Sequence, residues 1–434
     1  MKKEELISLI YEWQTVVLNR KGVTRETEKK ILAVLGSKPI KIITGFRRSG
    51  KSFLVQQIIQ KGIKNGLFEK DNFLYINFED YRLDEYTTNK HLEKIYRVFK
   101  ENICTPKGRK IIVFDEIQKI KNWDKFICTL YEKETNLELI ITGSNSEMLS
   151  SELSSKLSGR FIEFSITPFS FREYLLYHSI TCDNRKEYLR NKDKINKAFY
   201  DFLCFGGLPE TFEINTPEAK LSYCYGIITK IILDDVVKRF KVDNVELLEK
   251  IYRYLTAESG KLISFQNICN YAIQLGHNTK LETVIKYVGY LQKAFALFEV
   301  NKFDWSQKKV FAGQKKYYSI DTGLISVFRK ITENYSFRLE NIVALELYRR
   351  NKNLYFGRNY QGKEIDFIVS ENDQWNKFQV CAELTDQNID RETSVFGLSD
   401  KYLSGSNYLL TLDDFKKNIP AVIHENLIEW LLGF

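Results

Sequence analysis

Proline is scarce in this chain, with 6 in 434 residues, and no tract rich in Gly and Ser or in Gln and Asn interrupts it. Such tracts form the flexible linkers and low-complexity segments of proteins. Hydrophobic residues make up 44% and charged residues 28%, as in ordinary globular proteins. We therefore expect folded structure throughout, and the length favours two to four domains.

Patterns typical of metal sites and disulfides are also missing. The cysteines occur singly, form no CxxC pair and do not lie near the four histidines: Cys104, Cys128, Cys182, Cys204, Cys224, Cys269 and Cys381. Zinc sites and disulfide frameworks need closely spaced ligands or pairs, so we expect neither, and free thiols favour a cytoplasmic protein.

Long apolar runs are absent as well. No stretch approaches the ~20 apolar residues of a membrane span, and the first residues lack the apolar run of a signal peptide. We expect a soluble protein with no membrane partner. The formal net charge of +9 permits a nucleic-acid partner but does not require one, since charge runs are usually solvated faces.

Short apolar runs alternate with helical periodicity between residues 40 and 166, which predicts parallel strands joined by helices, an α/β fold. Residues 5–35 and 169–239 are mainly helical in pattern, and three helices are expected in 245–300. Strands are predicted at 40–44, 73–78, 110–114, 137–142, 161–166, 297–303, 316–320, 354–358, 364–369, 378–383 and 408–411. Further helices are predicted at 51–61, 91–101, 123–134, 339–350 and 422–432.

A glycine-rich loop between the first strand and helix matches GxxxxGK[ST], the P-loop pattern. Its glycines let successive N–H groups point at phosphate oxygens, while Lys51 reaches the β- and γ-phosphates and Ser52 offers its hydroxyl to Mg²⁺. We expect ATP to contact Gly45, Phe46, Arg47, Arg48, Ser49, Gly50, Lys51, Ser52 and Phe53. The alternative is a chance glycine turn before a helix.

The strand at 110–114 ends in two carboxylates, Asp115 and Glu116, the Walker B pattern. Asp115 is expected to hold Mg²⁺ through water, and Glu116 to orient and deprotonate the attacking water. Taken alone, such a pair could also cap a helix. Its position some sixty residues after the P-loop, one or two strands away, favours the catalytic interpretation.

Two further sites follow along the chain. Ser144 and Asn145, after the fourth strand, are candidates to contact the γ-phosphate or the attacking water, unless they only form a turn. Arg160, before the fifth strand, could neutralise the γ-phosphate in the transition state, in its own subunit or a neighbour's. It could equally be a surface arginine or part of an ion pair.

With the motifs that follow, these segments resemble a prokaryotic AAA-type ATPase family whose C-terminal domain is related to PD-(D/E)xK nucleases. Beyond the P-loop and Walker B segments, the matching stretches are 141–146, 157–160, 166–174, 205–210, 233–239, 318–324 and 362–369. The resemblance implies that Arg160 acts as an arginine finger across a subunit interface of a homo-oligomer. It also implies a winged-helix segment before the C-terminal domain.

The residues themselves support a helix-turn-helix followed by a hairpin. Helices are expected at 262–272 and 279–294, the second starting with a capping box between Thr279 and Glu282. Basic residues would form the wing and bind DNA phosphates: Lys302, Lys308, Lys309, Lys315 and Lys316. Lys280, Lys286 and Tyr290 are the expected exposed residues of the second helix, and Ile285, Val288, Leu291, Ala294 and Phe295 its core. Alternatively, this segment only packs the ATPase part against the C-terminal domain.

The C-terminal segment lacks a complete nuclease motif. Glu340 and Asp366 stand where carboxylates are needed, but Gln379 and Cys381 replace the Glu and Lys of the partner strand. Gln and Cys supply neither the charge for a hard cation nor an ammonium group. Recruiting Glu383 by a register shift supplies no lysine. We therefore expect a nuclease-like fold that does not cut.

Five regions are thus predicted: an N-terminal helical segment (1–36), an α/β P-loop core (37–167), a helical lid (168–240), a winged helix (241–330) and a degenerate restriction-endonuclease-like α/β domain (331–434). The expected activity is Mg²⁺-dependent ATP hydrolysis coupled to DNA binding. A nucleotide-gated scaffold for a protein partner and an ATP-regulated nuclease are the alternatives.

Overall fold

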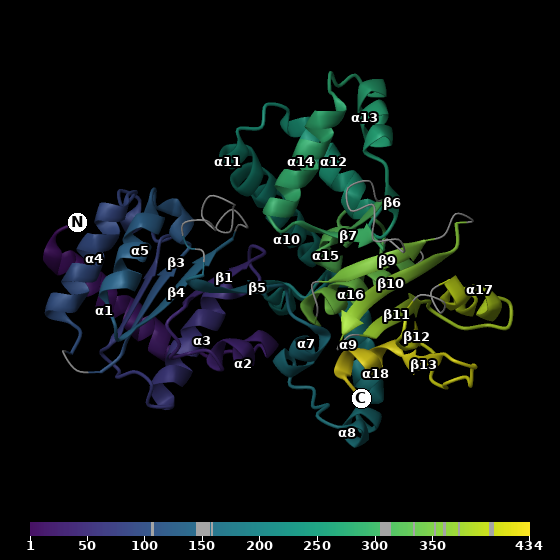
Figure 1. Cartoon of the computed structure of the whole chain (residues 1–434), viewed down its shortest axis with the longest axis horizontal. Coiled ribbons are helices and arrows are strands. Elements are labelled where there is room, and N and C mark those ends of the chain that lie inside the picture. Colours follow the sequence, from purple (N-terminus) through teal and green to yellow (C-terminus); the bar gives the residue numbers. More distant parts are fainter. Residues whose placement is uncertain are drawn as a thin grey trace. The chain divides into compact units, whose positions relative to one another are not determined.

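The computed structural model describes residues 1–105, 108–144, 157, 159–303, 314–332, 335–350, 353–358, 362–371, 374–398 and 403–434. The chain divides into two compact units, Met1–Thr167 and Pro168–Phe434 (Figure 1). One predicted boundary also falls after residue 167. The divisions predicted at 36, 240 and 330 remain predictions.

The first unit is built on a parallel five-stranded sheet with strand order β2-β3-β4-β1-β5. The strands are β1 Ile40–Gly45, β2 Phe73–Asn77, β3 Lys110–Asp115, β4 Leu137–Gly143 and β5 Phe161–Ile166. All five lie where the apolar runs predict them, and β3 is two strands from β1. Because the strands are parallel, their carboxyl ends meet at one edge of the sheet.

Successive strand residues point to opposite faces of this sheet, so each face has its own hydrophobic core. Ile112 and Phe114 of β3 belong to one core, and Ile111 and Val113 to the other. Residues of α4 and α5 cover the first face, and those of α3 the second. The helices of this unit are α1 Lys3–Asn19, α2 Glu26–Leu32, α3 Lys51–Lys64, α4 Asn89–Asn102 and α5 Trp123–Lys133, with 3-10 turns η1 Tyr81–Leu83 and η2 Ile117–Lys119.

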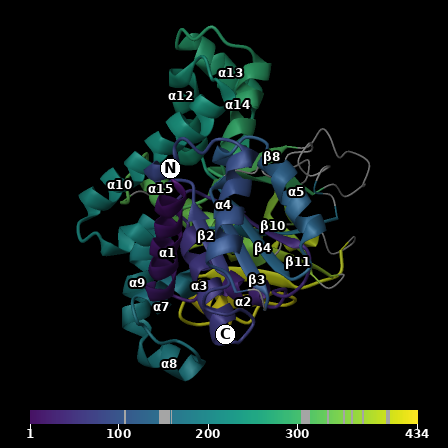
Figure 2. The same cartoon turned by 90° about the vertical axis from the view of Figure 1, so that its left-hand side faces the viewer.

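Helix α1 lies along β2, the edge strand of the sheet (Figure 2). The Gln14 amide donates a hydrogen bond of 2.7 Å to the carbonyl of Phe73. Leu9 packs in one core and Val17 in the other, which matches a helix at the edge of the sheet. The single helical region predicted at 5–35 is therefore two helices, α1 and α2, with residues 20–25 between them.

The second unit begins with helices, as the pattern of 169–239 predicts. These are α7 Phe171–Tyr177, α8 Arg185–Arg190, α9 Lys192–Phe205, η4 Pro209–Glu213, α10 Pro217–Lys230, the π-helix η5 Ile231–Val237 and α11 Lys238–Phe240. Later helices are α12 Val245–Ala257, α13 Phe265–Gln274, α14 Leu281–Lys293, α15 Thr322–Ser326, α16 Ser336–Arg350, α17 Ile389–Thr393, η6 Phe396–Leu398 and α18 Leu427–Leu432.

An eight-stranded sheet crosses two of the predicted regions. Its order is β13-β12-β11-β10-β9-β7-β8-β6. The strands are β6 Leu262–Ile263, β7 Leu297–Lys302, β8 Lys315–Ser319, β9 Leu354–Arg358, β10 Glu364–Glu371, β11 Gln374–Val380, β12 Asn407–Thr411 and β13 Ile423–Asn426. Strands β7 and β9 join the two halves through the parallel pairs Asn301–Tyr355 and Lys302–Phe356.

Three predicted elements of this unit are wrong in detail. Residues 262–263 form β6, and α13 starts only at Phe265, because the Ser264 hydroxyl caps its N-terminus. Helix α14 begins at Leu281 with Lys280 as N-cap, so Thr279 and Glu282 form no capping box. The predicted closing helix is split into β13 and α18, because the Asn426 side chain accepts the N–H groups of Ile428 and Glu429.

Two burial predictions also fail. Ile285, predicted in the core, is 46% exposed, because it lies on the outer face of α14. Lys316, predicted in the basic wing, is buried on β8 and forms ion pairs with Glu340 and Glu364. None of the helices that the structure describes is both long and apolar enough to cross a membrane.

Candidate nucleotide site

The loop between β1 and α3 turns sharply at two glycines. Gly45 has φ +141°, and a Cβ there would lie 2.0 Å from the Ile166 carbonyl oxygen. Gly50 has φ +90° and caps α3, which starts at Lys51. Only glycine adopts such conformations readily, so both residues are needed for the loop to close against β5 and enter the helix.

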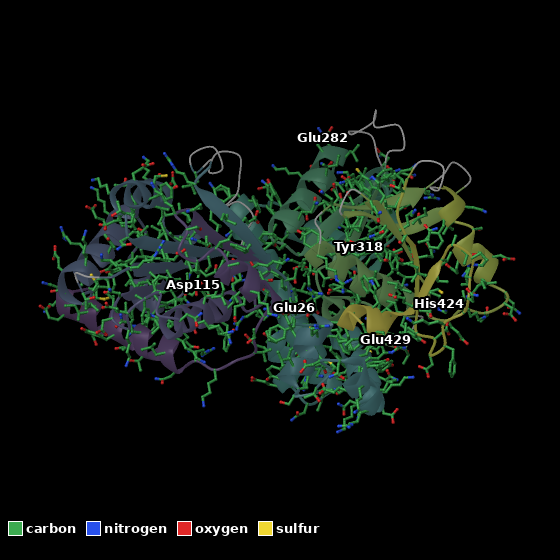
Figure 3. All side chains as sticks on the ribbon, turned by 60° about the horizontal axis from the view of Figure 1, so that its bottom comes forward. Glu26, Asp115, Glu282, Tyr318, His424 and Glu429 are labelled. Atoms are coloured by element: carbon green, nitrogen blue, oxygen red, sulfur yellow. The ribbon has the colours of Figure 1, made fainter. Side chains whose placement is uncertain are left out.

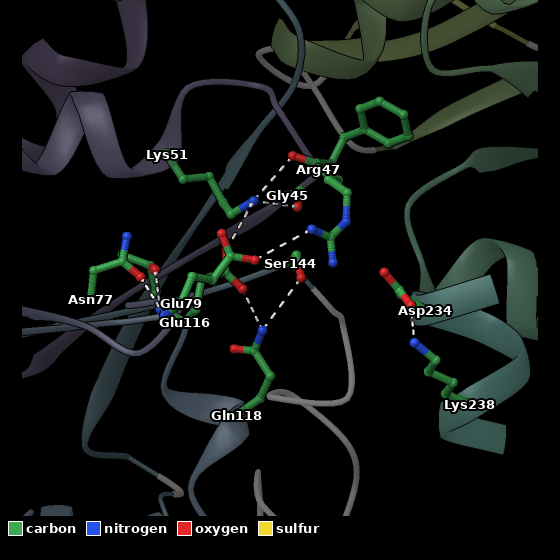
Figure 4. Close-up of polar contacts among 12 residues, drawn as sticks. Gly45, Arg47, Lys51, Asn77, Glu79, Glu116, Gln118, Ser144, Asp234 and Lys238 are labelled. Carbon is green, nitrogen blue, oxygen red and sulfur yellow. Dashed lines mark hydrogen bonds and ion pairs between the residues drawn. The ribbon is translucent and has the colours of Figure 1, made fainter. Parts of the chain in front are cut away.

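Lys51, the first residue of α3, extends its side chain back over this loop. Its ammonium group donates to the carbonyls of Gly45 and Phe46, each at 3.1 Å, and lies 3.8 Å from Oε1 of Glu116 (Figure 4). The side chain is buried. The Lys51 ammonium and the N-terminus of α3 both carry positive charge beside this loop. Together they make this end of the sheet attractive to phosphate groups.

Asp115, at the end of β3, is fully buried in the interior of the first unit (Figure 3). Its carboxylate accepts hydrogen bonds from the Tyr75 hydroxyl, at 2.6 Å, and from the Thr142 hydroxyl. Burial raises the pKa of Asp115 and nearby Glu116 adds to this, while hydrogen bonds from Ser52, Thr142 and Tyr75 oppose the rise. Tyr75 and Thr142 were not singled out in the sequence, because nothing but their strand positions marks them.

Glu116 follows with a left-handed backbone, φ +55°. Its N–H donates to the Thr142 hydroxyl at 3.0 Å, and its carboxylate accepts from the Gln118 amide. Burial alone would raise the pKa of Glu116, but the Lys51 ammonium and the Gln118 hydrogen bond together hold it below its ordinary value. The carboxylate is therefore held in its ionised form.

The structure brings together most of the predicted site residues at the carboxyl edge of the sheet. Ser144, after β4, is buried and accepts from the Gln118 amide at 3.3 Å. Asn145 lies outside the described residues. The Phe46 side chain is in the interior, so only its backbone can face a ligand, and Arg47 lies 3.4 Å from Glu79.

The N-terminal segment contacts the loop through a residue that sequence reasoning missed. Arg25 is buried and donates to the carbonyls of Ser49, at 2.7 Å, and Thr167, at 2.9 Å. Nearby, the Arg20 guanidinium lies 4.9 Å from the ring centre of Phe53. The backbone carbonyl of the loop is therefore fixed by a residue twenty-four positions earlier in the chain.

Arg160 lies at the opposite ends of the strands, where β1 and β5 begin. Its carbonyl accepts from the N–H of Ile40, at the start of β1, and its side chain pairs with Glu132 at 2.8 Å. Ile40 and Gly45 are the two ends of the six-residue strand β1, so they lie about 15–20 Å apart at the usual rise per strand residue. Arg160 therefore cannot reach the P-loop of its own subunit.

The predicted nuclease-like centre is an ion-pair cluster. The Lys316 ammonium lies 3.1 Å from Glu340 and 2.5 Å from Glu364, and Tyr318 donates to Glu340 at 2.7 Å. Burial and Glu340 raise the pKa of Asp366 well above its ordinary value. Among the described residues, no three His, Cys, Asp or Glu side chains are grouped so as to hold a metal ion.

The two motif positions on the partner strand, Gln379 and Cys381, carry no charge. The Gln379 amide oxygen accepts from the N–H of Asp366 at 3.3 Å, and its nitrogen donates to Glu392 at 3.0 Å. Burial raises the pKa of the Cys381 thiol to about 12. Gln379 and Cys381 thus serve local packing and hydrogen bonding, and a buried lysine supplies the positive charge.

Comparisons with known proteins agree with this geometry. Residues 37–175 match the family described as AAA domain, and residues 196–335 match a domain of unknown function. An uncharacterized protein of Methanocaldococcus jannaschii is 31% identical over 94% of this chain and 89% of its own length. An uncharacterized protein of Haemophilus influenzae is 30% identical over 91% of this chain and 94% of its own length.

Among solved structures, a Walker-type ATPase of Pyrococcus abyssi is 16% identical, with a TM-score of 0.49 over 72% of this chain and 99% of that chain. The full-length similarity to the two uncharacterized proteins is the stronger relation. The chain belongs to one family with them, and its first unit carries an AAA domain of the P-loop ATPase type.

Proposed function

We propose that this protein hydrolyses ATP with Mg²⁺ at the carboxyl edge of the five-stranded sheet. The observation that carries the proposal is the grouping of Lys51, Asp115 and Glu116, with 3.8 Å between the Lys51 ammonium and the Glu116 carboxylate. A phosphate-binding cation, a metal-binding carboxylate and an ionised base are the groups that phosphoryl transfer to water requires.

The residues present fit a magnesium ion. Ser52 and Asp115 offer a hydroxyl and a carboxylate oxygen close enough to hydrogen-bond, and Mg²⁺ prefers such oxygen ligands. When bound, the ion neutralises charge on the phosphate oxygens. Lys51 and the N–H groups of residues 45–52 bind the β- and γ-phosphates, Ser144 contacts the γ-phosphate or the water, and Glu116 accepts the proton of the attacking water.

Phosphate release by the wild type and Glu116→Gln tests this function. We expect magnesium-dependent turnover by the wild type and a loss of at least about 100-fold in the variant, the usual contribution of a general base. Binding of a fluorescent ATP analogue should persist in both. Glu93→Gln, on the exposed face of α4, is the matched control. Turnover retained by Glu116→Gln would contradict the assigned base.

Arg160 acts, in this proposal, on the nucleotide of a neighbouring subunit. The support is its position at the amino ends of the strands, whereas its own P-loop lies at their carboxyl ends. Mixing Arg160→Ala subunits, which keep Glu116, with Glu116→Gln subunits, which keep Arg160, should restore part of the activity that each lacks alone. No recovery in mixed oligomers would remove Arg160 from the mechanism.

The second unit couples the nucleotide state to DNA in this proposal. The support is the element order α12-β6-α13-α14-β7-β8, the order of a winged helix, with Lys280, Lys286 and Lys293 exposed on or just before α14. Of the predicted basic wing, Lys308 and Lys309 lie outside the described residues, and Lys315 pairs with Glu299 at 2.9 Å. DNA contact therefore rests on α14 more than on the hairpin.

A protein partner is the second candidate for this unit. Several apolar side chains are exposed on α13, at its C-cap or on α14: Tyr271, Ile273, Leu275 and Ile285. Fluorescence anisotropy with a labelled duplex over a range of NaCl separates the two. Loss of binding when Lys280, Lys286 and Lys293 are changed to Glu, but not in Lys261→Glu, supports DNA. Absence of wild-type binding at low salt favours the protein partner.

A further inference from the structure

Gln118 lies between two of the residues assigned to ATP hydrolysis. Its amide nitrogen donates to Oε2 of Glu116 and to the Ser144 hydroxyl, the latter at 3.3 Å (Figure 4). A carboxylate can only accept hydrogen bonds, so the nitrogen of the amide must face Glu116. The side chain therefore links the ends of β3 and β4 through one group.

The backbone explains why Gln118 reaches back to Glu116. Glu116 has φ +55°, and the 3-10 turn η2 starts at the next residue. This turn brings the side chain two positions on beside the Glu116 carboxylate. Glu116 is thereby held between two groups, with Gln118 on Oε2 and the Lys51 ammonium 3.8 Å from Oε1.

The oxygen of the Gln118 amide accepts no hydrogen bond from the part of the chain that the structure describes. Oε1 of Gln118 is buried and has no hydrogen-bond partner there. A buried acceptor left unpaired costs about 1–3 kcal/mol. A glutamine kept only for packing would be better replaced by an apolar residue of similar shape.

We propose that Gln118 is a positioning residue for the ATP hydrolysis proposed above, and that it holds the Glu116 carboxylate in one orientation beside Ser144. Fixing the base in one place leaves less reorganisation for the step in which the water loses its proton.

Gln118→Met tests the inference because it keeps the length of the side chain and removes the donor. We expect kcat to fall about tenfold, the order expected for one hydrogen bond to a charged group, and KM for ATP to change less than about twofold. Damage to the fold or to the nucleotide site would instead raise KM for ATP. A fall in kcat at an unchanged KM therefore distinguishes positioning of the base from a purely structural role.

Gln14→Met is the matched control. It removes an amide hydrogen bond of 2.7 Å, to the Phe73 carbonyl, in the same unit and away from Glu116. It should lower stability without lowering kcat. Gln118→Asn, which shortens the side chain by one methylene, repeats the test if the Met variant does not fold.

The outcomes separate the inference from the proposed function. A wild type that turns over ATP together with a folded Gln118 variant of unchanged kcat overturns the role of Gln118 alone. A rise in kcat overturns it too, since Gln118 would then restrain Glu116. A wild type that binds ATP without turnover overturns the ATPase function and the inference with it.

Discussion

Lys316 allows the sharpest test of how the second unit is held together. Its ammonium group is buried between Glu340 and Glu364, at 3.1 and 2.5 Å. Burial by itself would lower the pKa of Lys316, but Glu340, Glu364 and Asp366 outweigh it and hold the pKa above its ordinary value. The lysine therefore remains charged and is the counter-ion of this carboxylate cluster.

Lys316→Met keeps most of the side-chain volume and removes that charge. Breaking a buried ion pair by removing one partner typically costs about 3–5 kcal/mol. At about 1.4 kcal/mol per factor of ten, this corresponds to roughly a hundred- to several thousandfold lower hydrogen-exchange protection in the core of the sheet. The effect should be largest at neutral pH, because at low pH the freed carboxyl groups take up protons.

Hydrogen exchange by mass spectrometry on the full chain is the suitable assay, since it reports β8 and β10 separately from the first unit. Lys315→Met is the matched control. It removes the neighbouring lysine of β8, which is 38% exposed and bonds Glu299, so about 0–1 kcal/mol should be lost. Equal losses in the two variants would refute the reasoning that burial makes the Lys316 pair costly to break.

Three other predictions follow from buried polar groups. Tyr75→Phe should lower the apparent Mg²⁺ affinity of ATP hydrolysis about 10- to 100-fold by removing the hydroxyl that bonds Asp115 at 2.6 Å; an unchanged magnesium dependence would exclude this role. Glu138→Gln should destabilise the first unit by about 3–5 kcal/mol in calorimetry, because it leaves the buried Lys41 without its carboxylate. Burial raises the pKa of Asp321 to about 7. Folding therefore takes up a proton between about pH 4 and pH 7, and the stability of wild type relative to Asp321→Asn should fall as pH rises through that window. Denaturant unfolding at pH 5 and pH 8 measures it, and a relative stability that grows with pH would contradict the shift.

The first unit was predictable because its signals are local. Each buried parallel strand is a short apolar run, and the charged site residues lie directly at the strand ends, as Asp115 ends β3 and Glu116 follows it. Parallel pairing then brings those ends together without further information. Arg25, Tyr75 and Gln118 could not be found this way, because their contacts depend on how the start of α2, strand β2 and the turn after Glu116 pack.

The errors in the second unit have a common physical cause. Apolar periodicity predicts that Ile285 is a core residue, but the orientation of α14 leaves it exposed to solvent. Lys316 lies in a basic stretch of the sequence and is predicted in the wing. The pairing of β7 with β9 brings the C-terminal strands, with Glu364, next to it, and no local pattern predicts that pairing. Asn426 and Ser264 each cap the N-terminus of a helix inside a continuous apolar pattern.

The pairing of β7 with β9 has a practical consequence for dividing this protein. A chain shortened at residue 330 would keep the hairpin β7–β8 but lose the strand that hydrogen-bonds Asn301 and Lys302. It would also lose Glu340 and Glu364 and leave the buried Lys316 without its counter-ions. An unprotected strand edge next to an unpaired buried charge favours aggregation. The DNA-binding assay therefore belongs on the whole second unit, from residue 168 to residue 434, rather than on an isolated winged helix.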